Sequence, residues 1–139
     1  MKNIPKKIYL RKDALEHGYA VAREREIDGD INIEYILATP ALKAAHDERQ
    51  RQIEKEGYDA KHDDEHFKGE IARAAATYAQ PRLYRTDDFR GAPSLWPWHK
   101  KYWKPTPNDR KREITKAMAL LIAEYERIER KEGKSNELG

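Results

Sequence analysis

The stretch Ala117-Met118-Ala119-Leu120-Leu121-Ile122-Ala123 is the most apolar part of the chain and decides the predicted fold class. It lies inside a predicted helix over 106–133. Thr106-Pro107-Asn108-Asp109 supplies an N-cap, a proline at the first helical position and an acid, and Gly133 supplies a stop signal. We therefore expect a long helix at the C-terminal end of the chain.

This helix carries its apolar residues at spacings of three and four, as a helix with one buried face does. The predicted buried stripe consists of Ile114, Ala117, Met118, Leu121, Ile122, Tyr125 and Ile128. Because the centre of the helix is apolar on nearly every side, we expect it to be the core helix, with Leu121 buried.

Two further helices are predicted upstream. Thr39 and Pro40 open the first, which ends at Gly57. The second begins at Asp63 or Asp64 and ends before Pro81. Its predicted apolar stripe consists of Phe67, Ile71, Ala74, Ala75 and Tyr78.

The N-terminal part has strand character. Ile8-Tyr9-Leu10 is β-prone, residues 31–36 alternate apolar and polar side chains, and Asp28-Gly29 is a strong hairpin turn signal. With a strand through Tyr19–Arg25, these segments predict a two- or three-stranded antiparallel meander; the alternative is an irregular extended arm. The predicted fold class is thus mainly α (α+β), a short β-meander followed by a three-helix bundle with a long aromatic loop.

The predicted organisation is a β-rich segment over 1–38, a helical domain over 39–133 and a flexible tail over 134–139, all within one compact unit. The alanine-rich second helix and the thin core predict a homo-oligomer.

Lacking cysteine, the chain has neither disulfides nor zinc-thiolate sites. No apolar run approaches a membrane span or a signal peptide, so we expect a cytoplasmic protein without membrane partners.

The net charge of +3 is spread over interspersed acids and bases, which permits an anionic ligand but does not favour nucleic acid. Arg49 and Arg51, with Gln50 and Gln52, place guanidinium and amide groups within one helical turn, where they suit phosphate binding. An ordinary polar helix face is the alternative interpretation.

The connection over 81–105 is rich in proline, glycine and aromatic residues. Its part from Leu95 to Pro105 interleaves Trp96, Trp98 and Trp103 with basic residues, a mixture that can stack rings and contact phosphate. The favoured alternative is a rigid aromatic clasp that supplements the thin core. The two are compatible, because a clasp can also wall a pocket.

Two patterns raise the question of a metal. His62-Asp63-Asp64-Glu65-His66 matches an inverted zinc-protease motif, but acids at a helix N-terminus explain it better. A magnesium site is more credible, since Mg²⁺ needs one or two carboxylates together with water and phosphate oxygens. Its ligands would come from Glu48, Asp63, Asp64, Glu70 and Glu124, each of which also reads as a surface charge.

The segments Glu48–Gly57, Lys116–Glu124 and Trp96–Pro105, with Arg112, resemble small proteins encoded by bacteriophages and prophages. This resemblance implies a bacterial host cell and names no function. More distantly, the three helices are similar to MazG-like all-α nucleotide pyrophosphohydrolases, which hold Mg²⁺ through paired acids. Here Arg73 and Lys116 stand where that family carries acids, so the implied metal site is incomplete.

The sequence therefore predicts a phage-type accessory protein that binds a nucleotide or phosphorylated small molecule without hydrolysis and without a cofactor, for example as a counter-defence sponge. Its expected ligand-binding residues are Arg49, Arg51, Gln52, Lys116, Trp96, Trp98 and Trp103. One alternative is a magnesium-dependent pyrophosphohydrolase that uses Glu48, Asp64, Glu70 and Glu124. Another is a protein- or nucleic-acid-binding module whose aromatic loop is the contact surface.

Overall fold

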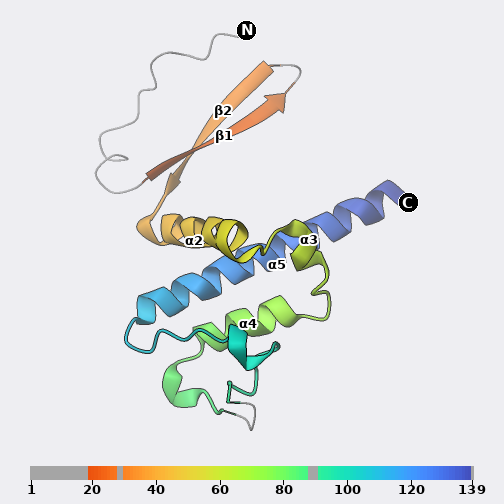
Figure 1. Ribbon diagram of the computed structural model, residues 1–139. Coiled ribbons are helices and arrows are strands. Elements are labelled where there is room, and N and C mark those ends of the chain that lie inside the picture. Colours follow the sequence, from red (N-terminus) through yellow and green to blue (C-terminus); the bar gives the residue numbers. More distant parts are fainter. Residues whose placement is uncertain (1–18, 28–29, 88–90, 139) are drawn as a thin grey trace. The chain divides into compact units, whose positions relative to one another are not determined.

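The computed structural model describes residues 19–27, 30–87 and 91–138, and the chain divides into two compact units, Met1–Ala44 and Ala45–Gly139. Its elements in chain order are β1 (Tyr19–Ile27), β2 (Asp30–Ala38), α2 (Pro40–Arg51), the π-helical turn η1 (Gln52–Glu56), α3 (Ala60–Asp64), α4 (Glu70–Ala79), the short 3₁₀ turns η2 (Arg82–Tyr84) and η3 (Lys100–Tyr102), and α5 (Arg110–Leu138) (Figure 1).

The first unit contains a β-hairpin. Strands β1 and β2 pair antiparallel, with Tyr19 opposite Ala38 and Ile27 opposite Asp30. The predicted strand at Ile8-Tyr9-Leu10 and the predicted turn at Asp28-Gly29 lie outside the described residues.

The predicted fold class, a β-meander followed by a three-helix bundle, is wrong. The described part of the chain contains four α-helices, because the predicted second helix is split into α3 and α4. Within the described residues of Ala45–Gly139 no strand occurs, so the functional unit is helical. The two described strands form one hairpin and no meander, and both precede the helical unit.

Both ends of the predicted first helix are confirmed. The Thr39 hydroxyl accepts a hydrogen bond from the Leu42 amide at 3.3 Å, as an N-cap does. At the other end Gly57 adopts a left-handed conformation with φ 75°, and its amide donates to the Gln52 carbonyl. The last turn is a π turn, a feature that often accompanies functional sites.

The start predicted for the second helix is wrong. Asp59, not Asp63 or Asp64, caps α3 by accepting a hydrogen bond from the His62 amide at 2.9 Å. The helix stops after one turn and α4 begins beyond Gly69, whose φ of 81° a glycine adopts without steric cost. Because Phe67 lies before α4, its side chain is exposed, whereas the predicted burial of Ile71, Ala74, Ala75 and Tyr78 is confirmed.

Of the stripe predicted to be buried on α5, only Ala117 is buried; the face that packs inward is otherwise a different one. Leu121 and Tyr125 are 53% and 66% exposed, and Ile128 is 40% exposed. The buried residues are Glu113, Lys116, Ala117, Ala119, Leu120, Ala123 and Arg127. Asp109, not Thr106, caps the helix by accepting from the Arg112 amide at 2.9 Å, and the helix continues past Gly133 to Leu138.

The core of the helical unit lies between α4 and α5, which run antiparallel along each other (Figure 1). Alanines on both helices allow a close approach, and the aromatic loop adds bulk. Trp96 is 2% exposed and meets Tyr78 edge to face, with ring centroids 5.6 Å apart. Trp103 also packs on Tyr78, at 4.7 Å.

Among the described residues no helix is long and apolar enough to cross a bilayer.

Candidate ligand-binding site

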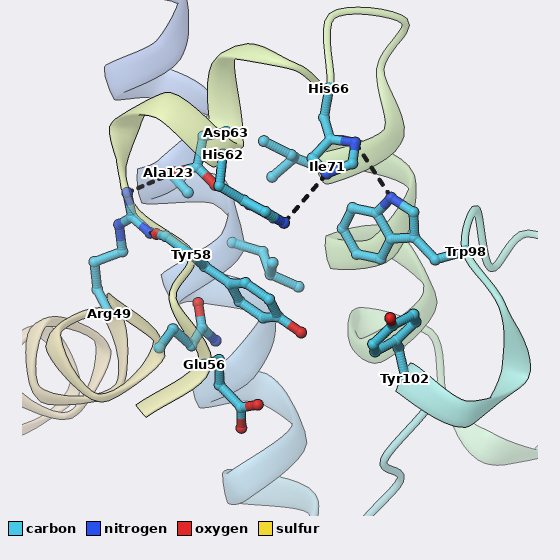
Figure 2. Close-up of a pocket in the computed structure, with 12 residues that line it drawn as sticks. Arg49, Glu56, Tyr58, His62, Asp63, His66, Ile71, Trp98, Tyr102 and Ala123 are labelled. Carbon is cyan, nitrogen blue, oxygen red and sulfur yellow. Dashed lines mark hydrogen bonds and ion pairs between the residues drawn. The ribbon is translucent and has the colours of Figure 1, made fainter. Parts of the chain in front are cut away.

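Two adjoining hollows of about 420 and 320 Å³ open on the helical unit. They share the lining residues Gln52, Glu56, Tyr58, Trp98, Tyr102 and Leu120, so they are two lobes of one cleft. The first, here the aromatic lobe, is further lined by Arg49, His62, Asp63, His66, Ile71 and Ala123 (Figure 2). The second, here the cationic lobe, is further lined by residues that include Glu48, Arg51, Lys104, Arg112 and Lys116.

The aromatic lobe is walled by a row of rings. Tyr58 stacks on His62 at 4.8 Å, His62 meets His66 edge-on at 4.7 Å, and His66 meets Trp98 edge-on at 5.2 Å. Tyr102 stands below Trp98 on the same side of the cleft (Figure 2). Such surfaces offer flat apolar faces and suit a planar ligand ring.

Hydrogen bonds along this row assign the imidazole tautomers. The Trp98 indole donates to His66 Nδ1 at 3.4 Å, so the proton of neutral His66 is on Nε2. His66 Nε2 lies 3.4 Å from His62 Nε2, and His62 Nδ1 lies 3.4 Å from Asp63 Oδ1. A single direction of donation, from Trp98 through both histidines to the carboxylate, satisfies every contact. Burial and the neighbouring His62 lower the pKa of His66, which favours this neutral form.

Arg49, a predicted phosphate contact, is instead held within the protein. It is 3% exposed, and it donates to the Tyr58 carbonyl at 2.8 Å and to Asp63 Oδ2 at 2.7 Å. A third bond reaches Glu126 on α5 at 3.1 Å. Arg49 therefore fixes the segment that carries Tyr58 and α3, because its guanidinium has a partner in each of Tyr58, Asp63 and Glu126. Figure 2 shows the bond to Asp63.

Glu48 organises the cationic lobe. Its carboxylate accepts from Arg51 at 2.9 and 3.0 Å and from the Gln52 amide at 3.1 Å, and it pairs with Arg112 at 2.6 Å. Burial alone would raise the pKa of Glu48, but these hydrogen bonds outweigh it and lower the pKa. The Gln52 side-chain amide is oriented by this contact; its side-chain oxygen, Oε1, is buried and has no hydrogen-bond partner in the described part of the chain.

The cationic lobe carries more positive than negative side chains. Arg51, Lys104, Arg112 and Lys116 face Glu48 and Glu56 as the two carboxylates of the lining. Arg51 bridges both acids, reaching Glu56 at 3.1 Å, and Lys104 lies 3.4 Å from Glu56. This half of the cleft therefore has a surplus of positive charge.

Lys116 is the unusual member of that set. It is 9% exposed, donates to the Lys104 carbonyl at 2.6 Å and lies 5.2 Å from the centre of the Tyr78 ring. Among the described residues no carboxylate lies within ion-pairing distance of its ammonium group. Burial, followed by the nearby Arg112, lowers the pKa of Lys116. Glu48 and Glu113 act in the opposite sense and raise the pKa of Lys116, but neither forms a direct ion pair with it. An anion that contacts this partly desolvated ammonium group therefore gains free energy.

The three tryptophans have different positions. Trp96 touches the cationic lobe but belongs to the core, as described above. Trp103 lines neither lobe; it packs on Tyr78, and the Arg85 guanidinium lies 5.5 Å from its ring centre. Trp98 lines both lobes. The loop thus combines the two predicted roles, a clasp through Trp96 and Trp103 and a cleft wall through Trp98.

The four carboxylates of the enzyme alternative do not converge. Asp64 pairs with Arg130 at 2.8 Å, and Glu124 pairs with Arg127 at 2.8 Å. Glu70 accepts from the Lys68 amide at 2.7 Å at the start of α4. Across the described residues no group of three or more His, Asp or Glu side chains is arranged to hold a metal ion. Of the four, only Glu48 lines the cleft.

Sequence reasoning missed several cleft residues. Tyr58 follows the helix-ending Gly57 directly, a position that carries no binding pattern. His62 and His66 match an inverted zinc-protease motif, which the sequence explains better by acids at a helix N-terminus; neither interpretation predicts the ring contacts that the structure shows. Tyr102 lies in the basic aromatic segment, where only the tryptophans drew attention. Arg112 follows the cap of α5 and shows no signal of its own.

Comparisons with protein-family models, with curated proteins and with solved structures found no match to this chain. The phage-type and MazG-like resemblances therefore have no support beyond the residues quoted for them, and they stay predictions. The function has to be argued from the cleft.

Proposed function

We propose that this protein binds a nucleotide, or a similar molecule that joins a planar ring to a phosphate, in the cleft of its helical unit. The observation that carries the proposal is the junction of an aromatic lobe with a lobe of surplus positive charge. Volumes of about 420 and 320 Å³ lie within the range of small-molecule sites, roughly 300–1,000 Å³.

In this proposal the ring of the ligand rests on Trp98, Tyr58 and the histidines, where stacking is worth ~1–3 kcal/mol per base. The phosphate enters the cationic lobe, where Lys116 supplies an unpaired ammonium group and Arg51 and Arg112 add positive charge. Arg51 and Arg112 keep their bonds to Glu48 when the phosphate binds. They attract the phosphate electrostatically and can donate hydrogen bonds from the N–H groups that Glu48 does not use.

Binding without hydrolysis is the favoured form of the proposal. Glu48 is the carboxylate of the cationic lobe that lies closest to the arginines. Its oxygens are occupied by Arg51, Gln52 and Arg112, so its role in the proposal is to position these side chains and not to hold a metal or activate water. Sequestration of a signalling nucleotide in a phage-infected cell is one biological use of such binding, and it rests on the phage-type resemblance alone. The module alternative is less favoured, because Trp96 is buried in the core.

Isothermal titration calorimetry with adenosine 5′-monophosphate, adenosine and inorganic phosphate tests the proposal. We expect the monophosphate to bind more tightly than either fragment. Lys116→Met should weaken monophosphate binding by about tenfold or more, because a hydrogen bond to a charged group is worth roughly 1.5–3 kcal/mol. Adenosine binding should be unchanged in the same variant.

Lys55→Met is the matched control, because Lys55 is exposed and lines neither lobe. It should bind the monophosphate like the wild type. Failure of all three probes to bind, or equal monophosphate affinity in Lys116→Met and the wild type, would contradict the proposed site. Mass spectrometry of small molecules released by denaturing the purified protein then identifies any ligand that co-purifies.

A further inference from the structure

An apolar stripe runs along the face of α5 that is turned away from the cleft. It consists of Ile114, Met118, Leu121, Ile122, Tyr125 and Ile128. Leu121 and Tyr125 are more than half exposed, at 53% and 66%. Continuous apolar surface of this kind on a helix marks a contact with another protein surface. Lys116 and Leu120 lie on the opposite, buried face, so the stripe and the cleft are separate features.

Charges at the two ends of the stripe indicate what covers it. Exposed Lys111 lies at its N-terminal end, and exposed Glu129 and Glu132 lie at its C-terminal end. Lys111 and Glu132 are equally far from the midpoint between Leu121 and Ile122, and they carry opposite charges. Two parallel copies of this helix would bring lysine against lysine and glutamate against glutamate, whereas two antiparallel copies bring opposite charges together.

We propose that α5 packs antiparallel against α5 of a second copy of this chain, about a two-fold axis that passes between Leu121 and Ile122. In this register Met118 of one copy lies opposite Tyr125 of the other, and Lys111 lies opposite Glu132. An isologous pair repeats each contact twice. The paired segment from 111 to 132 spans about 33 Å at 1.5 Å per residue.

The pairing accounts for both the apolar stripe and its charged ends. It covers large apolar side chains that the fold of one chain leaves in water, and the removal of apolar surface from water favours association. The flanking charges add little to affinity, but they select the antiparallel direction. This inference does not depend on the proposed ligand, because the stripe lies on the other face of the helix.

Sedimentation equilibrium of the full chain at micromolar concentrations tests the pairing. We expect a dimer for the wild type. Leu121→Asp should be monomeric, with a dissociation constant raised by at least about a hundredfold, because it buries two carboxylates beside the two-fold axis. Its circular dichroism should stay helical, since Leu121 is exposed in the single chain. A monomeric wild type, including one whose stripe is covered by its own N-terminal unit, or a Leu121→Asp dimer, overturns the inference.

Charge reversal gives a second, milder test that keeps the apolar stripe intact. Lys111→Glu and Glu132→Lys should each weaken the dimer by about three- to tenfold, because each places like charges together twice. The double variant should recover the wild-type dissociation constant, since it restores opposite charges in the antiparallel register. Additive weakening in the double variant would exclude this register and overturn the inference.

Discussion

Helices α4 and α5 pack along each other, but they use their side chains in opposite ways. Helix α4 buries its apolar stripe, with Ile71 at 1% exposure, and turns polar residues outward. Helix α5 buries small and charged residues, with Glu113 at 2% exposure, and leaves Leu121 at 53%. Helix α4 follows the usual rule for an amphipathic helix, whereas α5 departs from it over several turns.

Helix α5 differs from α4 because of the residues that other segments place against its buried face. The buried charged residues near the start of α5 have fixed polar partners on other segments: Glu113 pairs with Arg85 at 2.6 Å, and Lys116 donates to the Lys104 carbonyl at 2.6 Å. From Ala117 onward α5 presents alanines to the core, and these let α4 approach closely. A helix face is therefore buried here by the fit of neighbours and paired charges, not by the size of its apolar side chains.

The largest effect should come from breaking a buried pair. Glu113→Ala leaves the Arg85 guanidinium, itself 5% exposed, without its carboxylate, and removal of one partner of a buried pair costs about 3–5 kcal/mol. We expect that loss in the free energy of unfolding, measured by urea denaturation.

Lys131→Ala, at an exposed position of the same helix outside the apolar stripe, is the control and should change stability by less than about 0.5 kcal/mol. Similar losses in the two variants would mean that the buried face of α5 has been assigned incorrectly.

A second test compares apolar residues on the two helices directly. Ile71→Ala should destabilise by about 3 kcal/mol, because it empties a fully buried site in the core. Leu121→Ala should cost under about 1 kcal/mol in the monomer, measured in parallel by thermal unfolding at low protein concentration. If Leu121→Ala costs as much as Ile71→Ala in the monomer, α5 buries its apolar stripe after all and the contrast between the helices disappears.

A third test asks which tryptophan of the loop contributes to ligand binding and which contributes to stability. Trp98→Ala should weaken adenosine monophosphate binding by about tenfold, because stacking on an aromatic is worth ~1–3 kcal/mol. It should also lower the melting temperature, since Trp98 packs on Trp96 with ring centroids 5.3 Å apart. Trp103→Ala should mainly lower the melting temperature, since Trp103 packs on Tyr78 and lines neither lobe. Titration calorimetry and scanning fluorimetry separate the two effects. Intact binding in both variants would reduce the whole loop to a clasp.

The smallest effect concerns His66, a half-buried side chain whose hydrogen bonds depend on its protonation. The pKa of folded His66 lies below its ordinary value of 6.5, so the unfolded chain takes up the proton first as the pH falls. Stability contributed by neutral His66 is complete above pH 6.5 and is lost between 6.5 and the lower folded pKa. Protonation at Nδ1 also removes the acceptor for Trp98.

Melting temperatures of the wild type and of His66→Gln between pH 8 and pH 5 measure this contribution. Both keep His62 and the other histidines, so the difference between the two curves reports His66. We expect the wild type to lose more stability than the variant below pH 6.5. Parallel curves would show that His66 does not couple to folding.

Local sequence signals predicted those parts of the fold that depend on neighbouring residues only, namely helix ends and one apolar stripe. The cap at Thr39, the end at Gly57 and the stripe of Ile71, Ala74, Ala75 and Tyr78 are confirmed. The split at Gly69 was not predicted, because a glycine within a helical pattern does not reveal its φ. The predicted fold class was wrong partly because this split gives four helices instead of three. It was also wrong because strand propensity does not reveal how many strands pair with one another.

The candidate site was predicted only in part. Trp98, Lys116 and Arg51 line the cleft, whereas Trp103 does not and Arg49 is held by Asp63 and the Tyr58 carbonyl. Residue type makes an arginine suitable for phosphate, but it does not reveal which carboxylate already holds it.

Sequence alone determined the chemistry that this chain carries: helices with defined ends, an apolar C-terminal helix, an aromatic basic loop and a histidine pair. These follow from short-range rules, since caps, periodicity and composition depend on residues a few positions apart. Tertiary structure alone decided which face of α5 is buried, which cations are paired, and that Tyr58, His66 and Trp98 form one wall. Burial and pairing depend on contacts between residues far apart in the chain, such as Arg49 with Glu126, which no local pattern encodes.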